Sequence, residues 1–149
     1  MDVTTRAQLV TMLYRLEGEP AFMNDNVFSD VPAGSWYEKA VVWAQGKGII
    51  EGYGNGDFGP ADPIKREQAA AILYNYAKYK ELDVSVDENT NFLSFNDFFE
   101  VSEYAKSAMM WALQSGIIQG DGWDLKPGAP ADRAQTAQIL QRFCEDILK

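Results

Sequence analysis

The sequence predicts an all-α fold made of repeated pairs of helices, and three observations lead to this prediction. A pattern that opens at Phe28 occurs again at Phe95, and internal repetition of this kind fixes an architecture. Apolar residues recur at helical spacing in five segments, whereas few segments read as strands. A glycine-rich loop separates the two helices of each copy. We therefore predict one helical repeat domain over residues 1–149, with a half repeat, two full repeats and a linker loop at 1–20, 28–80, 95–149 and 81–94.

The half repeat is predicted to be a helix over residues 5–17. Thr5 suits the N-cap position, and Gln8 completes a capping box three residues later. Gly18 and Pro20 end this helix. Its apolar face has no partner helix in its own repeat, so we expect the other repeats, or self-association with a second chain, to cover it. The apolar residues of this face are Leu9, Met12, Leu13 and Leu16.

The first full repeat opens with a helix predicted over residues 35–45, where Ser35 and Glu38 suit a capping box. The loop from Gly52 to Pro63 holds four glycines and two prolines, so its path depends on special backbone angles. A second helix is predicted over residues 66–80. Its apolar stripe matches that of the half repeat position for position.

The second full repeat is predicted to contain helices over residues 102–114 and 133–148. Trp43 and Trp111 lie at helical spacing, so we expect both in the core. Cys144, on a mostly apolar helix, is expected to be a small buried hydrophobic residue.

The composition excludes several classes of function. The formal net charge is −9, whereas a nucleic-acid-binding protein needs a basic surface. The chain has no histidine and one cysteine, so we expect no metal site, no cofactor and no Cys/His nucleophile. No run of about 18 apolar residues is present, so we expect no membrane insertion. The chain starts within a repeat, as expected of a fragment of a longer protein.

The strongest functional signal is an arginine at the start of three predicted helices, at Arg6, Arg66 and Arg133. Helix capping explains the neighbouring residues but not a cation at the positive end of a helix dipole, which costs roughly 0.3–1 kcal/mol. An arginine beside backbone N–H groups suits a carboxylate or another anion. The alternative is a structural ion pair, with Asp30 or Asp97 as the partner.

Other motifs are weaker. Trp36, at a helix start, is a candidate platform for a sugar ring, and its counterpart Tyr104 keeps an aromatic ring. The glycine loops match neither a P-loop nor the dinucleotide-binding fingerprint, and Asn55–Asp57 do not complete an EF-hand. A glycosidase would need a pair of carboxylates, and the surroundings single out none. We therefore expect a protein that is not an enzyme.

Taken together, these motifs resemble the S-layer homology (SLH) domain. The resemblance rests on Phe28-Ser-Asp-Val, Trp36, Gly48-Ile-Ile, the loop that begins at Gly52, and the arginine at the helix start. At that helix start the family carries Thr-Arg-Ala-Glu or a close variant. The resemblance covers two complete repeats and the C-terminal half of a first repeat.

The resemblance implies a pseudo-threefold, three-pronged domain located outside the cell, in a Gram-positive-type wall or S-layer. It also implies a non-catalytic anchor that binds a secondary cell-wall polysaccharide, often through a pyruvylated sugar, in grooves between repeats. In that role the motif arginines would meet the pyruvyl carboxylate. The ligand-binding residues carried over in this way are Arg66, Gln68, Arg6, Gln8, Arg133, Gln135, Trp36, Asp30, Asp97 and Gly52.

The chain also departs from the family pattern. All three motifs have glutamine where many members have glutamate, Lys65 replaces the capping threonine, and the first repeat lacks its first half. An alternative function is therefore a structural or protein-interaction module that keeps the fold without binding sugar.

Overall fold

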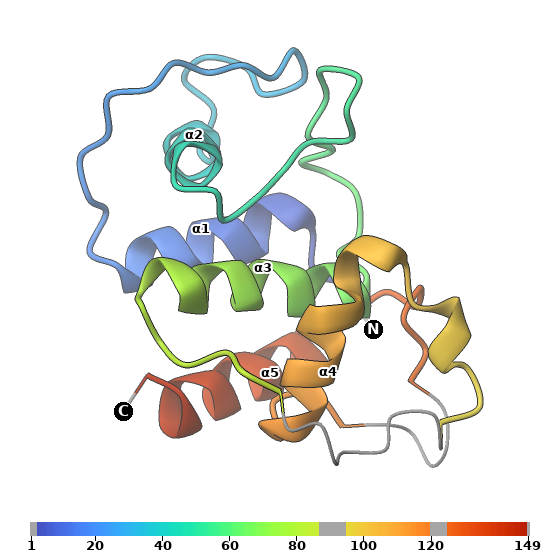
Figure 1. Cartoon of the computed structure of the whole chain (residues 1–149). Coiled ribbons are helices and arrows are strands. Elements are labelled where there is room, and N and C mark those ends of the chain that lie inside the picture. The colour runs from blue at the N-terminus through green and yellow to red at the C-terminus, as the bar shows by residue number, and fades with distance from the viewer. Residues whose placement is uncertain (1–2, 87–94, 120–124, 149) are drawn as a thin grey trace. The chain divides into compact units, whose positions relative to one another are not determined.

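The computed structural model describes residues 3–86, 95–119 and 125–148, and these residues form two compact units. The N-terminal unit is residues 4–64, and the C-terminal unit is Val3 with the described residues from 65 onward. Helices make up the regular structure, and only isolated β-bridges are found outside them in the described ranges. The all-α prediction is confirmed (Figure 1). The arrangement of three motif helices about a shared axis stays a prediction.

The N-terminal unit is built on α1 (Arg6–Leu16) and α2 (Glu38–Gly46), which pack against each other. Thr5 caps α1 as predicted, because its side chain accepts a hydrogen bond from the backbone N–H of Gln8 at 3.2 Å. Tyr14 of α1 meets Trp43 of α2 with ring centroids 5.4 Å apart. The largest fully buried side chains of this unit are Trp43, Phe58, Leu9, Leu13, Ile49 and Ile64.

The start of α2 differs from the prediction. Residues 32–38 form turns, in which Ser35 N–H donates to Pro32 and Glu38 N–H donates to Ser35. The helix therefore begins at Glu38, and Ser35 does not cap it. The side chain of Glu38 instead accepts a hydrogen bond from the backbone of Gly34 at 3.0 Å. The hydrogen-bonded turns that begin at Pro32 therefore take the place of the expected capping box.

The C-terminal unit contains α3 (Arg66–Tyr79), the 3₁₀ turns η2 (Phe98–Glu100) and η3 (Glu103–Ala105), α4 (Lys106–Gln114) and α5 (Arg133–Asp146). The helix predicted over residues 102–114 is thus divided into η3 and α4. α3 packs against both of these elements. Phe143 joins α5 to this core, with ring centroids 5.8 Å from Tyr76 and 6.3 Å from Trp111. Trp43 and Trp111 are both buried, as predicted.

Cys144 is exposed, so the prediction that it is buried is wrong. It shares one face of α5 with other exposed residues, Ala134, Ala137 and Gln141. The corresponding positions of α3 are mostly buried, and Tyr74 on that face contacts Trp111 of α4. Helical periodicity identifies a face, but only a packed partner buries it.

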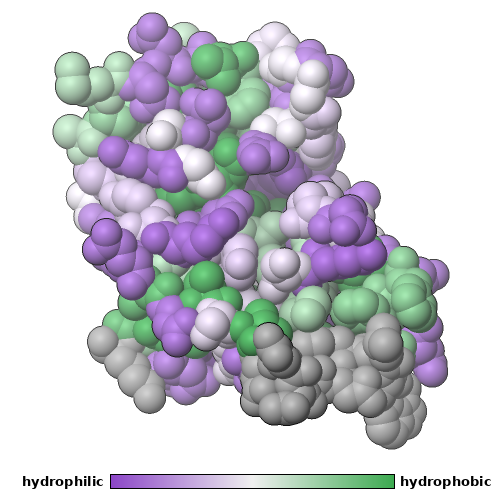
Figure 2. Space-filling model, viewed as in Figure 1, coloured by the Kyte–Doolittle hydropathy of each residue, from purple (hydrophilic) through white to green (hydrophobic). Residues whose placement is uncertain are grey.

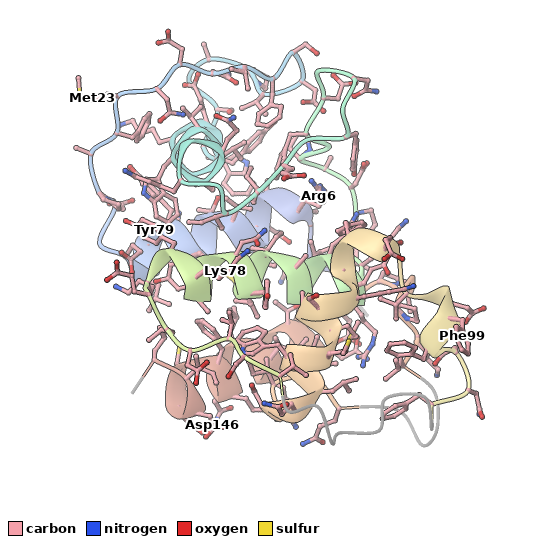
Figure 3. All side chains as sticks on the ribbon, viewed as in Figure 1. Arg6, Met23, Lys78, Tyr79, Phe99 and Asp146 are labelled. Carbon is pink, nitrogen blue, oxygen red and sulfur yellow. The ribbon has the colours of Figure 1, made fainter. Side chains whose placement is uncertain are left out.

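The surface in view is largely hydrophilic, with hydrophobic residues between the polar ones (Figure 2). Met23 and Phe99 project outward, with 99% and 78% of their surfaces exposed (Figure 3). In α1, Leu9 and Leu13 are buried while Met12 and Leu16 are 41% and 47% exposed. None of the described helices combines the length and the apolar character needed to cross a membrane.

Candidate functional site

Arg6 holds the glycine loop of the N-terminal unit. Its Nε donates to the carbonyl of Phe58 at 2.9 Å, and its Nη2 donates to the carbonyl of Glu51 at 3.2 Å. The guanidinium also lies over two rings, 4.6 Å from the Phe58 centroid and 4.8 Å from the Tyr53 centroid. Only 6% of Arg6 is exposed, and Figure 3 shows it at the start of α1 beside the loop. The sequence suggested a structural role for this arginine only as an ion pair with an aspartate, and it did not predict these carbonyl and ring contacts.

Arg66 makes the equivalent pair of contacts in the C-terminal unit. Its Nε donates to the carbonyl of Leu125 at 2.9 Å, and its Nη2 donates to the carbonyl of Gln119 at 2.8 Å. Unlike Arg6, Arg66 is partly exposed. Carbonyl oxygens are neutral acceptors, so these bonds orient the guanidinium without neutralising its charge. Arg66 can therefore hold its loop and still face a ligand.

The backbone N–H groups at these helix starts are engaged with the same loops. Arg6 and Ala7 donate to the carbonyls of Asp62 and Pro60, at 2.9 and 3.1 Å. At the start of α3, the corresponding bonds run from Arg66 to Ala129 and from Glu67 to Pro127, at 2.9 and 3.0 Å. The expectation that these N–H groups are available to an anion is therefore wrong for α1 and α3. An anion at these sites has to be bound by side chains.

Asp30 and Asp97 bind the same two loops through backbone N–H groups. The oxygens of Asp30 accept the backbone N–H groups of Phe58 and Gly59, both at 2.8 Å. Asp97 accepts those of Leu125 and Lys126, at 2.6 and 2.8 Å. Charge-assisted bonds of this kind are strong. In each unit, one loop residue therefore donates its N–H to an aspartate and offers its carbonyl to an arginine.

Gly52 has a steric reason to be glycine. A Cβ at this position would lie 2.6 Å from a ring carbon of Phe28 and 2.8 Å from the carbonyl oxygen of Asp57. Protein interiors are close-packed and do not absorb such overlaps. The glycine thus lets Phe28 pack against the loop.

The three glutamines of the motif close capping boxes. The side-chain oxygens of Gln8, Gln68 and Gln135 accept the backbone N–H of the residue three positions earlier, at 2.8, 2.9 and 3.0 Å. In the third motif, the Asp132 side chain accepts a hydrogen bond from the backbone N–H of Gln135 at 2.8 Å in return. In the second motif, the Lys65 side chain cannot accept the equivalent bond from Gln68, because a lysine side chain has no acceptor. Because these bonds use the side-chain oxygens of the glutamines, the side-chain NH₂ groups are the ones that could donate to a ligand oxygen.

Tyr53 and Asp62 close the loop of the N-terminal unit. The Tyr53 hydroxyl donates to Asp62 Oδ2 at 2.6 Å, and a Cβ on Gly59 would collide with both groups. Burial, followed by this hydrogen bond, raises the pKa of Tyr53 to about 12. Since folding favours the protonated phenol, this contribution to stability is present below about pH 10 and is lost as the pH rises through 12.

Trp36 and Arg133 are exposed. Trp36 is 61% exposed and packs edge-on against Tyr37, with ring centroids 5.0 Å apart. Its counterpart Tyr104 is 63% exposed. Both rings are thus accessible to a sugar. Arg133 lies at the exposed start of α5.

A pocket of about 300 Å³ lies within the C-terminal unit. It brings together Arg66 and Gln135, both predicted site residues, with side chains that sequence reasoning missed. Three of its polar residues, Gln135, Gln138 and Arg142, occupy one face of α5 at helical spacing, a stripe that the sequence could have revealed. The remaining lining residues are Ile118, Gln119, Lys126, Ala129, Pro130 and Ile139.

Glu67 of α3 holds the residue before η3, the short turn that leads into α4. It is 5% exposed, and its two carboxylate oxygens accept the backbone N–H and the hydroxyl of Ser102, at 2.8 and 2.7 Å. The other two motifs have alanine at this position, at Ala7 and Ala134. The contact is therefore specific to the second motif.

Glu67→Ala should lower the free energy of unfolding of the C-terminal unit by about 2–3 kcal/mol, because two bonds to a buried charge are lost. Glu67→Gln keeps one acceptor and should lose about half as much. Urea unfolding followed by tryptophan fluorescence would measure both. The exposed Glu103→Ala is the control and should change stability by less than about 0.5 kcal/mol. Equal losses for Glu67 and Glu103 would contradict the role of Glu67.

The sequence matches the profile of the S-layer homology domain twice, at residues 27–70 and 94–137, so the chain belongs to the S-layer homology domain family. It is 34% identical, over 95% of its length, to the exoglucanase XynX of Acetivibrio thermocellus. It is 33% identical over 93% of its length to an endoglucanase of Bacillus sp. (strain KSM-635), and 35% identical over 76% to an S-layer protein of Bacillus licheniformis. The chain spans only 13%, 14% and 12% of these three relatives.

Proposed function

We propose that this chain is a non-catalytic module that anchors a larger protein to the bacterial cell wall by binding an acidic wall polysaccharide. SLH domains anchor S-layer proteins and cell-surface enzymes, and the cell wall or S-layer is accordingly where this chain belongs. The enzymes among its relatives match it over a small part of their length only. We infer that the catalytic sites of these enzymes lie outside the region that matches this chain.

The pocket of the C-terminal unit is the observation that carries the proposal. Two of its lining residues, Ile118 and Ile139, are apolar and buried, and they suit the apolar face of a sugar ring. Gln119, Gln135 and Gln138 bring polar groups of the kind that hydroxyls bind. Arg66 adds a cation that the loop carbonyls hold in place. This combination fits a sugar that bears a carboxylate.

Arg66 is the residue that we propose meets the acidic group, a carboxylate such as that of a pyruvylated sugar. A planar guanidinium with several donors can bind a carboxylate through two bonds while it keeps its bonds to the loop. Trp36, Arg133 and Arg6 are not among the residues that line this pocket. Arg6 in particular has 6% of its surface exposed.

Arg66→Ala should weaken binding to pyruvylated wall polysaccharide by about ten- to a hundredfold, the equivalent of one charge-assisted hydrogen bond. Stability should also fall, by about 1–2 kcal/mol, because Leu125 and Gln119 lose their donor. Isothermal titration calorimetry below the unfolding transition separates the two effects. Lys65→Ala, an exposed cation at the neighbouring position, is the matched control and should leave the affinity within about twofold.

The competing function is a structural or protein-interaction module that keeps the fold without binding sugar. The fold roles of Arg6, Asp30 and Gly52 favour it, since these motif residues hold and fit the glycine loop of the N-terminal unit. Wall polysaccharide with and without its pyruvyl groups distinguishes the two functions. Equal retention on both polymers, unchanged by Arg66→Ala, would support the competing function.

A further inference from the structure

The pocket of the C-terminal unit gathers three cationic side chains from separate segments. Arg66 starts α3, Lys126 lies at the end of the glycine loop, and Arg142 lies on α5. Among the described residues that line the pocket, none is aspartate or glutamate. Cationic side chains gathered in one pocket raise the local concentration of anions there.

The fold does not require two of these cations. The preceding repeat has Gly59 at the position of Lys126 and Asn75 at the position of Arg142. It nevertheless holds its loop with the same arginine and aspartate contacts. That repeat also has carboxylates, Glu51 and Asp62, where the pocket has Gln119 and Ala129. The positive character therefore belongs to one repeat and not to the shared architecture.

The backbone of Lys126 supplies independent evidence. Its φ is 51°, in the left-handed region, and the equivalent Gly59 has a φ of 75°. A lysine in this region is strained, whereas glycine is not. The Lys126 backbone N–H donates to Asp97 at 2.8 Å, which fixes the strained residue in place. The C-terminal unit thus keeps a cation where the fold favours a residue without a side chain, as strained residues do at functional sites.

From these observations we propose that the pocket has a second anion subsite, formed by Lys126 and Arg142, in addition to Arg66. Its ligand would be a short acidic sugar segment that carries at least two negative groups. The first would be the carboxylate at Arg66, and the second a phosphate or another carboxylate on the adjoining residue. A volume of about 300 Å³ is at the small end for ligand sites, which limits the bound segment to a short one. This inference rests on the proposed polysaccharide-binding function.

The test exchanges the two cations for the residues of the preceding repeat, as Lys126→Gly with Arg142→Asn. Glycine relieves the strained backbone, and the hydrogen bond that Arg142 donates to the carbonyl of Ile117 is long, at 3.5 Å. The exchanged protein should therefore fold, which circular dichroism and the unfolding midpoint would verify. Lys65→Ala removes a cation outside the pocket and serves as the control.

Three probes would be titrated calorimetrically at one ionic strength. The first is a disaccharide with one pyruvyl carboxylate. The second and third are the same disaccharide with a phosphate monoester or a uronic carboxylate on the adjoining sugar. The unaltered chain and the control should bind at least one doubly acidic probe about ten- to a hundredfold more tightly than the singly acidic one. The exchanged protein should lose this preference and keep its affinity for the singly acidic probe.

The outcomes separate this inference from the proposed function. Preference for the phosphate probe alone, or for the uronic probe alone, supports the second subsite and identifies its group. Binding that depends on Arg66 but shows no preference between singly and doubly acidic probes overturns the second subsite and leaves the proposed function standing. An equal loss of affinity for all three probes in the exchanged protein also overturns the second subsite. Such a result would mean that the two cations attract any anion and do not bind a particular group. If the unaltered chain binds none of the probes, both proposals fail.

Discussion

Asp97→Ala should destabilise the C-terminal unit by about 3 kcal/mol, because two backbone N–H groups lose a charged acceptor. The bonds from Leu125 and Lys126 are 2.6 and 2.8 Å long, and they position the end of the glycine loop. Asp97→Asn offers only one acceptor oxygen and should lose roughly half as much. Urea unfolding followed by the fluorescence of the buried Trp111 would measure both changes.

The same substitution should also affect the pocket, since Lys126 is held by Asp97. A matched control is Asp146→Ala, which removes an exposed carboxylate at the end of α5. It should change stability by less than about 0.5 kcal/mol. If Asp97→Ala proved as stable as Asp146→Ala, Asp97 would not be holding the loop, and its role as a direct ligand contact would regain weight.

Arg6→Ala should destabilise the N-terminal unit by a similar amount, about 3 kcal/mol. The substitution leaves the carbonyl of the buried Phe58 without its charged donor and removes the guanidinium from two aromatic rings. Arg6→Lys keeps the charge but cannot reproduce the two-pronged geometry, so it should recover only part of the loss. Thermal and urea unfolding followed by circular dichroism would check this.

Arg133→Ala is the comparison for Arg6, because the motif residue is the same but the side chain is exposed. Its effect on stability should stay below about 1 kcal/mol. Similar losses for Arg6 and Arg133 would mean that burial does not determine the contribution of a motif arginine. That result would contradict the reading of Arg6 as a structural residue.

The sequence predicted the helices well because helical signals are local. Caps, apolar stripes and terminating glycines lie within a few residues of one another, and α1, α3 and α5 begin at the predicted arginines. The misplaced start of α2 shows where local signals compete, since turn bonds after Pro32 prevailed over the Ser35 capping box.

The role of the motif residues could not be predicted in the same way. The bond that Arg6 donates to Phe58 spans 52 positions of the chain, and the bond that the Phe58 N–H donates to Asp30 spans 28. Sequence patterns show that an arginine recurs, but not which carbonyl it meets. The pocket is assembled from the start of α3, two loop segments and α5. Arg66 and the polar stripe of α5 could be predicted from local signals, but the fact that they line one pocket could not.

The packing of α1 on α2 and of α3 on α4 has a consequence for fragments of this protein. The sequence repeat pairs α2 with α3, yet each of these helices packs on a helix from a neighbouring repeat. A piece cut at 28–80 would separate α2 from α1 and α3 from α4, and so bare two apolar faces to water. A piece cut at 4–64 would keep one packed pair and its loop together. Truncation, shuffling or duplication of this chain should therefore keep each packed pair of helices together. The boundaries of these pairs are shifted by half a repeat from the boundaries of the sequence repeats.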